Sequence, residues 1–81
     1  MTQTINMTLD ARGLSCPLPI LKTKKALAQL AMSELLEVIS SDPGSVKDLS
    51  SFCEQTGHEL LSSDIQEDEF VFVIKKDSRE E

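Results

Sequence analysis

With 81 residues and only two cysteines, the chain has room for one small domain over residues 1–81, and for neither a disulfide scaffold nor a recognisable zinc site. Its formal net charge of −6 argues against direct binding of nucleic acid. The sequence has no basic start followed by an apolar run, which is the pattern of a signal peptide. The longest uninterrupted apolar stretch, residues 70–74, is far too short to cross a membrane. We therefore expect a cytoplasmic protein with free thiols.

The first half of the chain has the pattern of a strand, a helix and a second strand. Residues 6–11 alternate apolar and polar side chains, which is the period of a half-buried strand. After a proline-rich turn, a helix is expected to run to about Ala31. Residues 34–40 are rich in branched apolar side chains and predict the second strand. The inner face of this first helix is expected to carry Ile20, Thr23, Leu27, Leu30 and Ala31.

The second half predicts a helix followed by two strands. Asp42 is expected to cap the helix, with Pro43 at its first position and Gly57 ending it in a left-handed turn. The remaining strands are expected over residues 58–65 and 70–74, joined by a turn at residues 66–68. Apolar side chains recur at three- and four-residue steps in this helix, and they predict a buried face formed by Val46, Leu49, Phe52 and Cys53.

The element order is therefore βαβαββ, which is an α+β arrangement. Right-handed crossovers would place both helices on one face of a mixed four-stranded sheet, giving a two-layer sandwich without a deep cleft. The continuous apolar run of the last strand predicts a strand covered on more than one side. The pattern leaves the strand order open, and residues 1–4 and 77–81 are expected to be loosely held.

The strongest functional signal is the segment Gly-Leu-Ser-Cys-Pro-Leu-Pro at residues 13–19. It places Cys16 where a loop gives way to a helix, and the positive end of the helix dipole favours the reactive thiolate. Pro17 and Pro19 restrict the backbone directly after the cysteine. Either Cys16 is the N-cap, with the Leu18 amide left to donate, or Pro19 is the first helical residue. Both arrangements present the sulfur outward on a stiff turn.

The sequence around this cysteine resembles the TusA (SirA-like) family of small sulfur carriers. The likeness continues through residues 41–45, 57–60 and 72–76, in the family's order. It implies the βαβαββ sandwich and a persulfide formed on Cys16, with no cofactor. It also implies a sulfur donor, such as a cysteine desulfurase or a rhodanese-like protein, and an acceptor protein, for example in tRNA thiolation. The residues that carry the resemblance are Asp10-Ala11-Arg12-Gly13-Leu14-Ser15-Cys16-Pro17-Leu18-Pro19, followed by a lysine-rich helix.

The neighbours of Cys16 divide into two expected roles. Asp10 and Gly13, with the two prolines, are expected to shape the loop that presents the thiol. Basic and apolar side chains are expected to contact a partner, because no acidic residue occurs between residues 11 and 33 and surface charges steer encounter. A merely solvated face is the alternative for the lysines. The expected partner-binding residues are Arg12, Leu18, Leu21, Lys22, Lys24 and Lys25.

Three functions remain on this evidence. The leading hypothesis is a monomeric relay component rather than a stand-alone turnover enzyme. The second is a regulatory or protein-interaction module in which Cys16 is a redox sensor or a structural cap. The third is a thiol oxidoreductase that pairs Cys16 with Cys53, although Cys53 lies on an apolar helical face and is expected to pack in the core. His58 is expected to have a surface or capping role.

Overall fold

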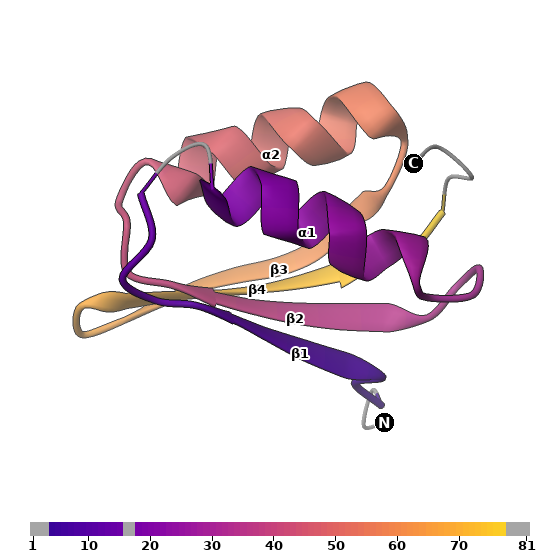
Figure 1. Cartoon of the computed structure of the whole chain (residues 1–81), viewed down its shortest axis with the longest axis horizontal. Coiled ribbons are helices and arrows are strands. Elements are labelled where there is room, and N and C mark those ends of the chain that lie inside the picture. Colours follow the sequence, from indigo (N-terminus) through magenta and orange to yellow (C-terminus); the bar gives the residue numbers. More distant parts are fainter. Residues whose placement is uncertain (1–3, 16–17, 78–81) are drawn as a thin grey trace.

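The computed structural model of the chain describes residues 4–15 and 18–77. Two helices lie on one face of a four-stranded sheet (Figure 1), which confirms the two-layer α+β architecture expected from the element order. The elements are β1 (Met7–Ala11), α1 (Leu18–Ala28), β2 (Leu35–Ser40), α2 (Ser45–Thr56), β3 (Glu59–Gln66) and β4 (Glu69–Lys75).

The strand order, which the sequence pattern left open, is β1-β2-β4-β3. β1 and β2 are parallel, and β4 runs antiparallel to both β2 and β3. The apolar run of β4 is explained by this central position, because both of its edges are paired. Only one of its faces is covered by helices: Phe72 and Ile74 are fully buried on that face, whereas Val71 and Val73 are half-buried on the other.

The core lies between the sheet and the two helices. Alternate side chains of β1, β2 and β4 point toward the helices, as the period of a strand requires. α1 contributes Thr23, Ala26 and Leu27, and α2 contributes Leu49 and Cys53. The predicted inner faces are confirmed at Thr23, Leu27, Leu49 and Cys53, and Ala26 joins them. Ala31 is exposed because the helix ends before it.

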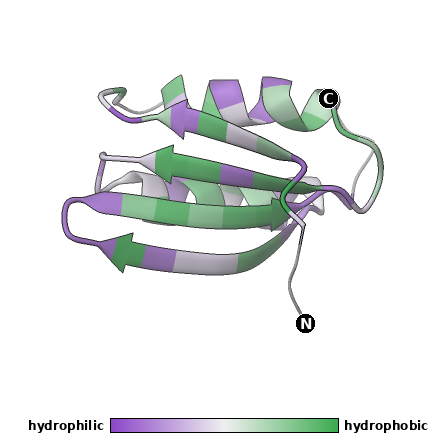
Figure 2. Cartoon of the chain, turned by 90° about the horizontal axis from the view of Figure 1, so that it is seen from below, coloured by the Kyte–Doolittle hydropathy of each residue, from purple (hydrophilic) through white to green (hydrophobic). Residues whose placement is uncertain are grey.

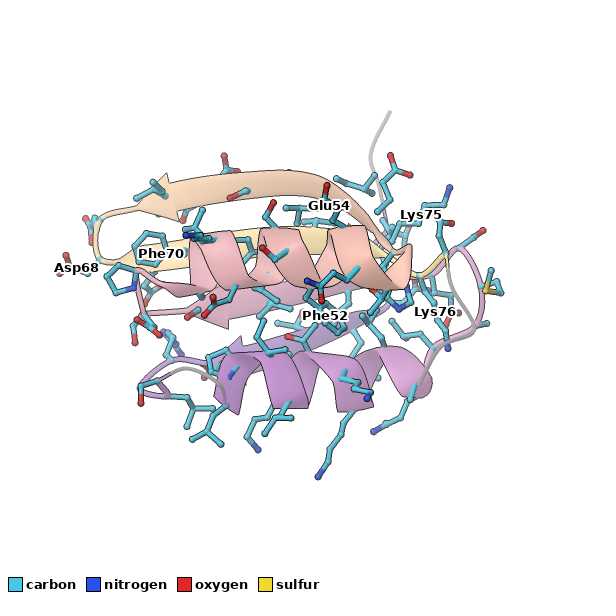
Figure 3. The ribbon with its side chains drawn as sticks, turned by 90° about the horizontal axis from the view of Figure 1, so that it is seen from above. Phe52, Glu54, Asp68, Phe70, Lys75 and Lys76 are labelled. Carbon is cyan, nitrogen blue, oxygen red and sulfur yellow. The ribbon has the colours of Figure 1, made fainter. Side chains whose placement is uncertain are left out.

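α1 ends at Ala28 rather than near Ala31, and the residues just beyond it form a tighter turn that Lys76 contacts. The amide of Leu30 bonds the carbonyl of Leu27, a tighter turn than the α-helix makes. The carbonyl of Leu30 accepts a hydrogen bond of 2.7 Å from Nζ of the buried Lys76. Lys76 lies at the end of the sheet opposite the turn that contains Asp68 (Figure 3).

α2 begins at Ser45, later than expected. Asp42 precedes it in a tight turn, in which the Ser45 amide and hydroxyl both donate to the Asp42 carbonyl at 2.9 and 2.6 Å. The Asp42 carboxylate accepts from the Gly44 amide at 3.2 Å. The predicted end of this helix is confirmed, since Gly57 adopts a left-handed conformation with φ of 92°.

The strands of the sheet carry both hydrophobic and hydrophilic residues along their length (Figure 2). Within the described residues, neither helix has the length and apolar character needed to span a membrane. The same residues contain no group of three or more His, Cys, Asp or Glu side chains placed to hold a metal ion.

Candidate functional site

The loop that precedes Cys16 lies at the end of the sheet where both helices begin and the β3–β4 hairpin turns (Figure 1). Cys16 and Pro17 themselves lie outside the described residues, so the expected exposure of the thiol and the framing role of Pro17 remain predictions. The residues on either side of them, Ser15 and Leu18, are exposed. The described part of the site is therefore the loop before the cysteine and the helix after it.

Ion pairs fix the start of this loop. The Arg12 guanidinium donates to both carboxylate oxygens of Asp10, at 2.9 and 3.0 Å, and to Glu69 in β4 at 3.1 Å. The Arg12 amide also donates to Asp10 at 3.1 Å. Hydrogen bonds from Arg12 hold the pKa of Asp10 at about 2, and both carboxylates raise the pKa of Arg12. Arg12, expected to bind a partner, is thus used within the molecule, although half of its side chain is exposed.

Gly13 provides the second attachment of the loop. Its φ is +82°, a left-handed conformation that side chains other than glycine rarely adopt. Its amide donates to the hydroxyl of Ser41, in the β2–α2 connection, at 2.9 Å. The next amide, that of Leu14, closes a turn on the carbonyl of Ala11 at 3.3 Å. Arg12 and Gly13 therefore hold the approach to Cys16 against two distant segments of the chain, β4 and the β2–α2 connection.

α1 begins at Leu18, one residue before Pro19. This start lies between the two alternatives drawn from the proline spacing. The Leu18 amide, expected to be left for the cysteine, donates to the Ser15 carbonyl at 3.0 Å. Pro19 is fully buried, so its ring anchors the first turn of α1 in the core.

The exposed flank of α1 carries the side chains expected to contact a partner. Leu18 and Leu21 are 44% and 51% exposed, which is high for large apolar side chains. Lys22, Lys24 and Lys25 are also exposed. Because the helix ends at Ala28, Lys25 lies in its last turn, where a cation is favoured by the helix dipole.

The second cysteine is part of the core. The Cys53 side chain is 3% exposed, and burial raises the pKa of its thiol to about 11. A thiol in this setting is protonated at neutral pH and is a poor nucleophile. The packing role predicted for Cys53 is confirmed.

A surface position, one of the two roles expected for His58, is wrong. His58 is 6% exposed and its ring stacks on Phe52 with centroids 6.0 Å apart. Its Nδ1 accepts a hydrogen bond from the Asp77 amide at 3.2 Å. Burial, with a smaller contribution from Lys76, lowers the pKa of His58. No local pattern marks this burial, because Asp77, whose amide bonds the ring, lies 19 positions away in the sequence.

The whole described fold also matches known proteins. The family model for sulfurtransferase TusA matches residues 7–76. The chain belongs to the TusA family. It is 53% identical over 68 residues to the sulfur carrier protein TusA of Allochromatium vinosum, covering 84% of this chain and 90% of that protein. It is 48% identical to a candidate sulfur carrier protein of Neisseria meningitidis serogroup A, covering 84% and 92%.

A solved structure gives the same result for the fold. The crystal structure of a SirA-like protein from Desulfitobacterium hafniense superimposes with a TM-score of 0.78 at 26% identity, covering 89% of this chain and 99% of that one. The resemblance read from the Cys16 motif is confirmed, and with it the sulfur-carrier class to which the chain was assigned.

Proposed function

We propose that this TusA-family chain is a sulfur carrier in which Cys16 alternates between a thiol and a persulfide. The observation that carries the proposal is the family match over residues 7–76 around the Cys-Pro-Leu-Pro motif. In loading, the Cys16 thiolate attacks the outer sulfur of a donor persulfide. A new S–S bond forms at Cys16, the donor's S–S bond breaks, and the donor leaves as a thiolate. Delivery to an acceptor thiolate is the same exchange with Cys16 as the leaving group.

The described loop supports this proposal through its rigidity. Sulfur exchange needs the attacking thiolate in line with the sulfur–sulfur bond, and a pre-ordered loop lowers the entropic cost of reaching that geometry. Arg12 and Gly13 tie the loop to the β3–β4 hairpin and to Ser41. Pro19 anchors the other side in the core. The segment before Cys16 and the segment after it are therefore each held in place by contacts with the rest of the chain.

The partners we propose are a donor that carries a protein persulfide, such as a cysteine desulfurase or a rhodanese-like protein, and a separate acceptor protein. Leu18 and Leu21 would give the donor an apolar contact beside the thiol, and the lysines of α1 would attract acidic surfaces. We further propose that the chain works as a monomer in a reducing cytoplasm, where the thiol stays free between transfers.

Intact-mass spectrometry tests the sulfur-carrier proposal. The chain is incubated with a cysteine desulfurase and cysteine, and its mass is measured before and after reduction. We expect a reducible gain of one sulfur atom, lost in Cys16→Ala and retained in Cys53→Ala. No gain in the native chain with any desulfurase or rhodanese donor, or a gain that survives Cys16→Ala, would reject it. A Cys16→Ala chain that keeps its biological activity would favour the regulatory module instead.

The contact expected beside the thiol is tested by the rate of loading. Leu21→Asp should slow sulfur loading while leaving the unfolding midpoint unchanged, because Leu21 is half exposed and outside the core. Lys47→Glu, at an exposed position of α2, is the matched surface control. Equal loading rates for both variants would remove Leu21 from the donor interface.

A further inference from the structure

A shallow groove separates α1 from β1 on the side of the helix away from α2. Its volume is about 230 Å³. Met7 and Leu9 of β1, both half-buried, form its apolar floor together with Ala26. The exposed side chains of Lys22, Lys25 and Gln29 form its rim. The groove therefore combines an apolar base with two cations.

The groove runs along an unpaired edge of the sheet. β1 is the terminal strand in the order β1-β2-β4-β3, and within residues 4–15 and 18–77 nothing pairs with its outer side. An edge strand presents a row of backbone N–H and C=O groups that can pair with an added strand. Addition of an extended segment to such an edge is a common mode of peptide recognition.

Charge distinguishes this edge from the other one. Beside β1, Lys22 and Lys25 stand on the helix side, and the acidic Asp10 projects on the opposite side of the sheet, where it is paired with Arg12. The other edge strand, β3, carries the exposed Glu59 and Asp64. In a chain of net charge −6, an acidic segment is attracted to the β1 edge and repelled from the β3 edge.

We propose that the β1 edge and its groove bind an extended, acidic segment of a partner protein, which adds to the sheet as a fifth strand. Side chains of an added strand alternate between the two faces of the sheet. Glutamates on the helix side would lay their aliphatic stems over Met7 and Leu9 and bring their carboxylates to Lys22 and Lys25. Pairing of backbone groups supplies the affinity, and the two lysines select a bound strand that carries negative charge.

A second copy of the chain is a poor occupant of this groove. Two β1 edges paired about a two-fold axis present the same surface to each other. Lys22 and Lys25 of one copy would then face the same lysines of the other copy, and like charges at close range oppose that pairing. The charge of the rim therefore favours a partner of opposite sign.

The rim of the groove adjoins the contact proposed beside the thiol, because Lys22 and Lys25 lie one helical turn after Leu18 and Leu21. At about 100° per residue, Lys22 and Lys25 lie about 60° apart around α1, whereas Lys24 lies about 160° from Lys22. Lys24 does not line the groove, so of the three lysines only Lys22 and Lys25 are placed to contact a strand bound there. Binding at the groove does not depend on the sulfur chemistry, so the Cys16→Ala chain is expected to bind an acidic strand as well as the native chain does.

Amide NMR with synthetic peptides tests the proposal. The probes are capped peptides that alternate glutamate with valine, glutamine with valine, and lysine with valine. We expect saturable shifts of the β1 amides (Met7–Ala11) and of Lys22 and Lys25 with the glutamate peptide alone. Lys22→Glu/Lys25→Glu should weaken that binding by about tenfold or more. Lys47→Glu, on the exposed surface of α2, should leave it unchanged.

Several results would overturn the proposal. Equal shifts with the glutamine and glutamate peptides would show that the groove does not select its ligand by charge. Shifts centred on β3 would place the binding at the other edge of the sheet. An absence of saturable shifts would show that the edge takes no strand. Shifts of the β1 amides that grow with protein concentration alone, accompanied by dimerisation, would assign the groove to a second copy. Sulfur loading measured on the same samples reports separately on the thiol.

Discussion

The structure predicts that the two thiols of this chain differ greatly in reactivity. Burial raises the pKa of Cys53 to about 11, so at about pH 7 only about one chain in ten thousand carries the Cys53 thiolate. An unperturbed cysteine with a pKa of about 8.5 is a few per cent thiolate at the same pH. The thiolate fractions therefore differ by a factor of about a hundred or more. The Cys53 side chain is also only 3% exposed, so steric protection lowers its reactivity further.

Alkylation followed by intact-mass spectrometry measures this difference. The folded native chain treated with iodoacetamide should take up one label rapidly, on Cys16, and a second only after denaturation. Cys53→Ala should behave like the native folded chain, and Cys16→Ala should remain unlabelled until it unfolds. Rapid labelling of Cys53 in the folded Cys16→Ala chain would refute the argument from burial and would revive an oxidoreductase that uses both cysteines.

Five further substitutions test the packing and the loop. Gly13→Ala should cost about 1 kcal/mol in urea denaturation, because its Cβ meets no atom within 4 Å and only the left-handed backbone is penalised; no loss would contradict the assigned φ. Thr23→Val should raise the unfolding free energy by about 1 kcal/mol, since the buried Thr23 hydroxyl has no hydrogen-bond partner among the described residues; a loss would reveal a missed partner. Phe72→Ala should cost about 3–5 kcal/mol and Ile65→Ala, 68% exposed, less than about 0.5 kcal/mol; similar losses would contradict the burial pattern. Because burial lowers the pKa of His58, the unfolded chain binds a proton first, so stability should fall as the pH drops below about 6.5, and His58→Gln should flatten this dependence.

Much of the architecture could be predicted from the sequence because its local signals agree with one another. The alternation in β1 and the helical spacing of Leu49 and Cys53 each identify an element and its buried face. Gly57 ends α2 where its sequence position suggested. The motif at residues 13–19 indicated the family, because a cysteine followed by Pro-Leu-Pro is a local sequence pattern that needs no tertiary information.

Long-range contacts decided what the local pattern could not. The pairing of β4 between β2 and β3 set the strand order, because hydrogen bonds between strands join residues that are far apart in the chain. Lys76 binds the Leu30 carbonyl just beyond α1, and the neighbouring Asp77 amide bonds the buried His58. A lysine and a histidine carry no sequence mark of such burial.

The same distinction separates the two surfaces of α1. Composition alone determined that the first helix is basic, and helical periodicity determined which of its side chains share a face. The tertiary fold decided that Lys22 and Lys25 stand beside the outer edge of β1, the terminal strand of the described sheet. It also decided that Arg12 is held by Asp10 and Glu69. The physical reason is that the charge of a residue is intrinsic, whereas the partner available to that charge depends on which distant segments the sheet brings beside it.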